Sequence, residues 1–205
     1  AEPTPENFSK VVRDLYGEYA DEVLTLYPAT SVEETIQSAT DLAGDRFIGF
    51  STWRWFEMHR LTGKAPVYRY FYAHPRPPMK PEMGDATPGL AGGVVRGNQQ
   101  AERPPAPRGA VHSAEIEYAM GNLATNPVYA WTDDDYRVSD VLQGYFANFV
   151  KAGNPNGLGL PEWPAAPSTK DGQIMLMRIE VESRAVPAPH RDRYLLLESI
   201  QEPGG

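Results

Sequence analysis

The sequence comprises 205 residues, of which 41% are hydrophobic and 22% charged. This is an ordinary globular composition, with enough chain for one domain or for a large piece of a bigger one. The formal net charge is −8 and the basic residues form no cluster, so nucleic-acid binding is not expected. Cysteine is absent, which excludes disulfides, thiolate metal sites and a cysteine nucleophile. No apolar run approaches the roughly 20 residues of a membrane span.

The first residues, AEPTPENF, show neither a charged leader segment nor an apolar one. We therefore expect any targeting signal to lie upstream of Ala1. The sequence does not fix a compartment, although periplasmic or secreted locations are slightly favoured over the cytoplasm.

The first 63 residues are expected to form helices. Pro5 suits a first helical position and Gly17 a stop, Pro28 ends the next segment, and Ser31 suits an N-cap. Glycine closes each of the last two segments. The expected helices cover residues 5–16, 19–27, 32–43 and 45–63, with Gly44 and Gly63 as the last two stops.

Residues 65–75 are β-branched and aromatic with a proline near each end, which predicts a buried strand. Residues 76–109 follow, with seven prolines and six glycines and no periodicity. Loops of this length without regular structure are usually functional or disordered. This one leads directly to His112.

The remainder returns to regular structure. A helix is expected after His112, and another from the N-cap Thr132 to about Ala152, with Asp133, Asp134 and Asp135 in its first turn. A strand is expected over 173–183 and a last helix over 190–200. Helices alternating with separated strands indicate part of an α/β sheet. Two strands form too small a sheet to pack against this many helices, so part of the sheet is expected to be missing.

His112, in the segment GAVHSAEIEYAMGNL, is the best candidate for a catalytic base. It follows a strand and a long loop and precedes a helix, and loops at sheet ends carry the chemistry of α/β enzymes. Glu115, one helical turn on, is a candidate for supporting it. The structural alternatives are a histidine at a helix start and an acid favoured by the helix dipole.

Other candidate sites are weaker. His59, His74 and His190 make no metal-ligand spacing, and the aspartate run suits a helix start better than a calcium loop. The glycine-rich segment GLAGGVVRG does not have the spacing of a phosphate loop, and no metal site is expected from the histidines and aspartates. Ser51 in GFSTW lacks the closing glycine of a nucleophile elbow and is rejected. The chain thus offers a base without a nucleophile.

Four blocks nevertheless resemble, in order, the C-terminal part of the type-B carboxylesterase family of α/β-hydrolases. The third is close to the family signature Gly-x-x-His-x-x-Glu-x-x-Tyr-x-Phe-Gly, with Met120 replacing the usual aromatic. The resemblance covers roughly residues 8–200. The blocks are AGDRFIGF (43–50), VYRYFYAHP (67–75), GAVHSAEIEYAMGNL (109–123) and YFANFVKAGNPNG with EWPAAP (145–157 and 162–167).

The resemblance implies the C-terminal part of one α/β-hydrolase domain over 1–205, with few strands, many helices and a Pro/Gly-rich insertion, 76–109, near the active site. It implies a Ser-Glu-His triad and no cofactor. His112 falls on the triad histidine and Glu115 on a buried glutamate beside it. A separate or missing N-terminal portion would complete the fold and supply the serine and the glutamate. None of the acids Glu22, Glu33 and Asp45 matches the motif of the triad acid.

The expected function is therefore carboxylic ester hydrolysis of a small-molecule ester, with this chain supplying the histidine. The alternatives are a non-catalytic hydrolase-like binding protein and an inactive fragment. Five basic residues in the insertion favour an acidic ester as substrate, or else belong to a solvated loop. They are Arg76, Lys80, Arg96, Arg103 and Arg108.

Overall fold

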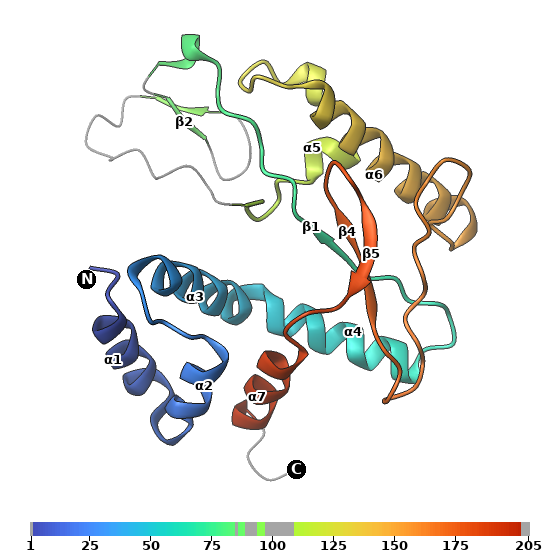
Figure 1. Cartoon of the computed structure of the whole chain (residues 1–205). Coiled ribbons are helices and arrows are strands. Elements are labelled where there is room, and N and C mark those ends of the chain that lie inside the picture. Colours follow the sequence, from blue (N-terminus) through green and yellow to red (C-terminus); the bar gives the residue numbers. More distant parts are fainter. Residues whose placement is uncertain (1, 85, 89–93, 97–108, 202–205) are drawn as a thin grey trace. The chain divides into compact units, whose positions relative to one another are not determined.

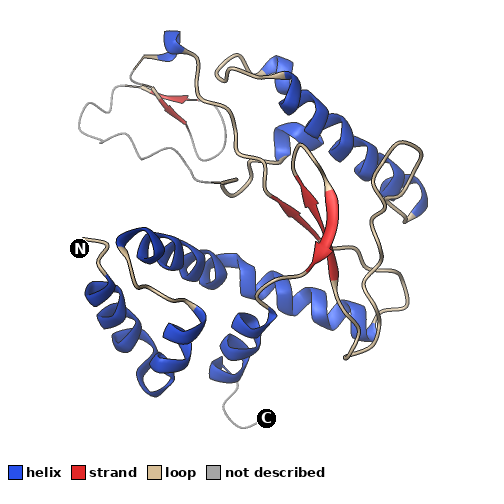
Figure 2. Ribbon diagram, viewed as in Figure 1, coloured by secondary structure: helices blue, strands red, loops and turns tan. Residues whose placement is uncertain are grey.

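The computed structural model describes residues 2–84, 86–88, 94–96 and 109–201. Two compact units form within it, each with its own core. Unit 1 comprises residues 1–65, 168–170 and 188–205, and unit 2 comprises residues 66–167 and 171–187. Figure 2 shows that helices make up most of the regular structure of the described part.

Unit 1 is helical (Figure 1). Its cores collect apolar side chains from helices that are far apart in the sequence. The elements are α1 (Pro5–Tyr16), η1 (Gly17–Tyr19), α2 (Ala20–Leu26), α3 (Val32–Gly44), η2 (Asp45–Gly49), α4 (Phe50–Thr62) and α7 (Arg191–Gln201). The main core residues are Phe8, Val12, Ala20, Val23, Tyr27, Leu42 and Leu196, and a smaller cluster joins Phe50, Trp53 and Leu197.

The predicted helix starts at Pro5 and after Ser31 are confirmed. The Thr4 hydroxyl accepts a hydrogen bond from the backbone N–H of Asn7, and Ser31 does the same for Glu34. These bonds satisfy N–H groups that have no partner inside the helix. The predicted stop at Gly44 is wrong: the chain stays helical through the π-helical turn η2 into α4. Gly44 has helical torsions, and the backbone continues through the wider π-helical turn into α4 without a break.

A buried arginine joins three segments of unit 1. Arg193 of α7 donates to the Leu26 carbonyl at 3.1 Å and to Asp41 at 2.9 Å. Its guanidinium also lies 4.4 Å from the ring centre of Tyr27. The Tyr27 hydroxyl in turn donates to Asp45 at 2.8 Å. One side chain therefore fixes α7 against the end of α2 and against α3.

Unit 2 contains a three-stranded sheet with the order β1-β4-β5 (Figure 1). The central strand β4 runs parallel to β1, with Tyr70 opposite Met177, and antiparallel to β5. The strands are β1 (Tyr70–Tyr72), β4 (Met175–Ile179) and β5 (Arg184–Pro187), and the helical elements are η3 (Pro81–Met83), α5 (Ile116–Ala119), η4 (Leu123–Thr125) and α6 (Asp133–Ala152).

The strand predictions are partly wrong. The first strand covers three residues of the predicted 65–75, because its backbone pairs with β4 only over that stretch. The second ends at Ile179, where a turn closed by Ser183 leads into β5, a strand that was not predicted. Residues 76–109, expected to lack regular structure, include η3 and the antiparallel pair β2 (Thr87–Pro88) and β3 (Val94–Val95).

The core of unit 2 lies between the sheet and helices α5 and α6. The helix α6 has a capping box, in which Thr132 and Asp135 satisfy each other's backbone N–H groups, and ends at Gly153 in the left-handed conformation. Its predicted start is therefore confirmed. The buried residues are Tyr72, Ala114, Tyr118, Leu123, Val138, Leu142, Tyr145, Trp163, Met177 and Ile179.

Replacing Arg193 by Met should lower the free energy of unfolding by about 2–3 kcal/mol, because the Leu26 carbonyl and Asp41 lose a charged donor in a mostly buried place. Urea denaturation followed by far-UV circular dichroism measures the change. The matched control is Arg13→Met. Arg13 makes an ion pair with Asp21, but both side chains are more than half exposed, so the cost should stay below about 1 kcal/mol. Equal costs for the two variants would refute this assignment.

Candidate active site

His112 is exposed and lies on a turn that directly precedes α5. The Ala114 N–H donates to the Val111 carbonyl at 3.1 Å and closes this turn. Ser113, within it, has a φ of 65°, a conformation that costs a residue with a side chain on the order of 1 kcal/mol. Such a conformation persists only where its surroundings fix it, and the next residue, Ala114, is fully buried. The backbone of the turn beside His112 is therefore held in one conformation.

Glu115 is half-buried and occupies the N-cap position of α5. Burial raises the pKa of the Tyr70 hydroxyl, and the negative charge of Glu115 raises it further. The Glu115 carboxylate is thus close enough to strand β1 to act on it electrostatically. The structure brings both predicted site residues, His112 and Glu115, onto one short segment beside the sheet.

The carboxylate of Asp135, in the first turn of α6, has hydrogen-bond partners on both of its oxygens. Only 2% of Asp135 is exposed. Its Oδ1 accepts a hydrogen bond from the Tyr118 hydroxyl at 2.6 Å and lies 2.9 Å from Nε2 of His74. Its Oδ2 accepts bonds from the backbone N–H and the hydroxyl of Thr132, at 2.8 and 2.6 Å. One carboxylate therefore joins the end of β1, helix α5 and the start of α6.

These contacts shift the pKa values of Asp135 and Tyr118. Burial alone would raise the pKa of the Asp135 carboxyl, but the hydrogen bonds from Thr132, Tyr118 and His74 outweigh it and lower the pKa below its ordinary value. Burial, together with the bond to Asp135, raises the pKa of the Tyr118 hydroxyl. At neutral pH the aspartate is thus an ionised acceptor and the tyrosine a protonated donor.

A second ion pair attaches the segment after β1 to α5. Arg76 lies 2.8 Å from Glu117, and both side chains are mostly buried. The Arg76 guanidinium lies 5.4 Å from the ring centre of Tyr129, and Asn126 donates to the Glu117 carboxylate. Arg76, one of the basic residues considered for substrate recognition, is thus committed to an ion pair. Residues 85, 89–93 and 97–108 of the insertion, with Arg103 and Arg108, lie outside the described residues.

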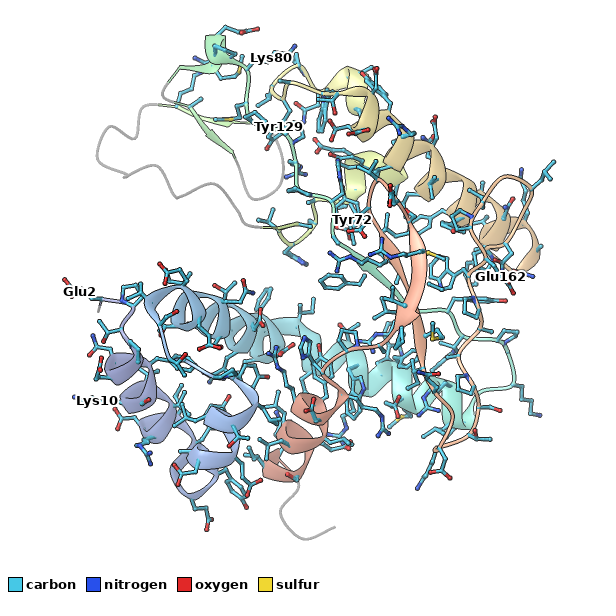
Figure 3. All side chains as sticks on the ribbon, in the orientation of Figure 1. Glu2, Lys10, Tyr72, Lys80, Tyr129 and Glu162 are labelled. Atoms are coloured by element: carbon cyan, nitrogen blue, oxygen red, sulfur yellow. The ribbon has the colours of Figure 1, made fainter. Side chains whose placement is uncertain are left out.

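The segment with His112 leads into a helix at the carboxyl end of the parallel strand pair. The ring of Tyr118 lies 5.5 Å from that of Tyr72, the last residue of β1, and 5.6 Å from that of His74. Figure 3 labels Tyr72 at this position. Parallel strands end at the same edge of a sheet, and ligand sites of open α/β sheets lie at that edge. Helix α5 and the turn before it therefore occupy a place typical of an active site.

The residues rejected from the sequence have structural surroundings of their own. Ser51 lies on α4, and its hydroxyl donates to the Ile48 carbonyl at 3.1 Å. It borders an open hollow of about 360 Å³ within unit 1, together with Phe47 and Trp55. Asp45 accepts the hydrogen bond of Tyr27, and Glu22 and Glu33 are exposed.

Among the described residues, no group of three His, Asp or Glu side chains gathers in a way that could hold a metal ion. Within the same part of the chain, none of the helices combines the length and the apolar character that crossing a bilayer demands.

The contact between His74 and Asp135 was not predicted from the sequence. The Thr-x-x-Asp spacing of residues 132–135 correctly indicated a helix start, and that was the only local signal. The partners of Asp135 come from 17 and 61 residues away. Nothing in the local pattern could therefore show that its carboxylate is buried and shared.

Comparison with known proteins places this geometry in a family. The model of the carboxylesterase family matches residues 3–194. Carboxylesterase 5A of Canis lupus familiaris is 32% identical over 168 residues, covering 78% of this chain and 23% of that protein. Liver carboxylesterase 1 of Oryctolagus cuniculus is 31% identical over 136 residues, covering 66% of this chain and 20% of that protein. The chain thus spans less than a quarter of the length of these relatives.

Solved structures agree on the fold. A PNB esterase aligns with a TM-score of 0.56 at 21% identity and covers 95% of this chain and 33% of that one. A thermophilic PNB esterase aligns with a TM-score of 0.53 over the same shares. These proteins are α/β-hydrolases, and the described part, rich in helices around a three-stranded sheet, is a partial version of their fold. The chain belongs to the carboxylesterase family.

Proposed function

We propose that this chain is the histidine-bearing part of a serine carboxylic ester hydrolase, and that His112 is its general base and acid. The main support is the position of His112, on an exposed and conformationally fixed turn directly before the helix at the carboxyl end of strands β1 and β4. Membership of the carboxylesterase family gives the reaction class.

The chemistry divides between two portions of a longer hydrolase. The sequence contains no Gly-x-Ser-x-Gly elbow, so the nucleophilic serine and the triad glutamate lie, in this proposal, on an N-terminal portion. That portion would also provide the backbone N–H groups of an oxyanion hole. Strand β1 is one of the two edge strands of the sheet in the described part, and Phe71 on it is more than half exposed. An edge of this kind suits a further strand supplied by the N-terminal portion.

In the proposed reaction, the serine hydroxyl attacks the ester carbonyl while His112 removes its proton. The tetrahedral intermediate collapses, the C–O bond to the alcohol breaks, and His112 returns the proton to the departing oxygen. Water, deprotonated by the same histidine, then cleaves the acyl-enzyme and releases the acid. Glu115, half-buried three residues after His112, supports the base in this scheme.

Replacing His112 by Ala in the complete hydrolase should lower kcat for a p-nitrophenyl ester by at least about 10³-fold, since the serine loses its base. Spectrophotometric release of p-nitrophenolate measures the loss. His59→Ala is the matched control, because His59 is also exposed but lies on α4 of unit 1. It should keep full activity.

Labelling with a fluorophosphonate serine probe tests the same proposal without a substrate. The unaltered hydrolase should take up one probe on its serine, and His112→Ala should slow labelling strongly. Near-normal hydrolysis and labelling in His112→Ala would sink the assignment. An unaltered hydrolase that takes up no probe would favour the alternatives, a binding protein or an inactive fragment.

Replacing Glu115 by Gln should lower kcat about ten-fold with little change in KM, because a small displacement of the base slows the reaction without loosening substrate binding. Steady-state kinetics on the same ester measure both constants. Glu182→Gln, an equal change at an exposed site after β4, serves as the control. If both variants behave like the unaltered hydrolase, Glu115 has no supporting role.

A further inference from the structure

The buried carboxylate of Asp135 does more than cap a helix. A capping box uses one acceptor oxygen, which here is Oδ2 facing Thr132. In α3 the corresponding acid, Glu34, is half-exposed, and its carboxylate accepts hydrogen bonds from the neighbouring Thr30. In α6 the second oxygen, Oδ1, is committed to Tyr118 and His74, two residues of other segments. This additional linkage has no function in capping.

Tyr118 connects this carboxylate to the segment that carries His112. Its hydroxyl donates to Asp135, and its backbone carbonyl accepts a hydrogen bond from the Ser139 hydroxyl at 2.7 Å. Tyr118 is fully buried, as is Ala114 in the turn after His112. The Ile116 N–H also donates to the Ser113 carbonyl. Residues 113–118 are thus held at both ends, and the Tyr118 hydroxyl and the Ser139 hydroxyl form the hydrogen bonds that join them to α6.

The linkage is polar although it lies in the core of unit 2. Burying an ionised carboxylate costs free energy that only well-directed donors offset, and Asp135 has donors on both oxygens. Hydrogen bonds are directional, whereas apolar contacts allow sliding. The carboxylate therefore fixes the position and the orientation of α5 in a way that a hydrophobic contact could not.

We propose that Asp135 and Tyr118 are positioning residues for His112, and that their hydrogen bond holds the turn of residues 111–115 where the imidazole meets the serine. The inference rests on the proposed function of His112. It adds two residues, neither of which touches the substrate, that act on the rate through the position of the base.

The test compares two single-hydroxyl deletions in the complete hydrolase, Tyr118→Phe and Tyr145→Phe. Both tyrosines are fully buried in the same core. The Tyr118 hydroxyl donates to Asp135, and the Tyr145 hydroxyl donates to the Pro161 carbonyl at 2.7 Å and also lies 3.7 Å from the Met177 sulfur. Tyr145 lies on α6, away from the turn with His112. We expect Tyr118→Phe to lower kcat ten-fold or more with KM within two-fold, and Tyr145→Phe to leave both constants unchanged.

A second variant, Asp135→Asn, removes the charge and one acceptor oxygen. It should lower kcat in the same way. Combining it with Tyr118→Phe should lower kcat little further, because both changes break the same contact, the hydrogen bond between Tyr118 and Asp135. Thermal unfolding of each variant, with assays well below its midpoint, separates lost structure from lost positioning. The rate of fluorophosphonate labelling should fall in parallel with kcat.

The outcomes separate the two proposals. If His112→Ala is inactive while Tyr118→Phe and Asp135→Asn keep full kcat, His112 remains the base and the positioning role is overturned. The same holds if Tyr145→Phe loses as much kcat as Tyr118→Phe, since the effect is then general to the core. If His112→Ala retains turnover, the proposed function fails and the positioning role fails with it.

Discussion

Unit 2 is organised around one buried carboxylate. Asp135 takes hydrogen bonds from Thr132 on its own helix, from Tyr118 on α5 and from His74 after β1. Because these donors come from three separate segments, the carboxylate can be satisfied only when sheet and helices meet correctly. A buried charge left without these donors would be strongly destabilising, so the arrangement selects one packing. The segment with His112 belongs to that packing through α5.

In unit 1 a buried positive charge, that of Arg193, joins separate segments in a similar way. Arg193 satisfies a backbone carbonyl at the end of α2 and the carboxylate of Asp41, while Tyr27 covers its guanidinium. In each unit the apolar core supplies most of the favourable free energy, and a buried ionised side chain helps to fix the elements relative to one another. These ionised contacts join segments that are far apart in the sequence.

The chain covers about a third of a PNB esterase that it resembles in fold. The proposed function requires His112 to be held in a fixed position against a nucleophile that lies elsewhere, and the described contacts around His112 support such a position. The turn is closed by a backbone hydrogen bond, Ser113 adopts a left-handed conformation, and Ala114 is buried. The proposed roles of His112 and Asp135 are therefore a base and the support that positions it.

The sequence by itself determined the helix starts at Thr4, Ser31 and Thr132, because capping depends on residues within one turn. It also identified the family and the segment with His112. It could not determine the short extent of β1, the strand β5 or the continuous helix through Gly44, since these depend on backbone pairing and packing. Only the tertiary structure decided that Asp135 is buried and shared, because its partners come from distant segments.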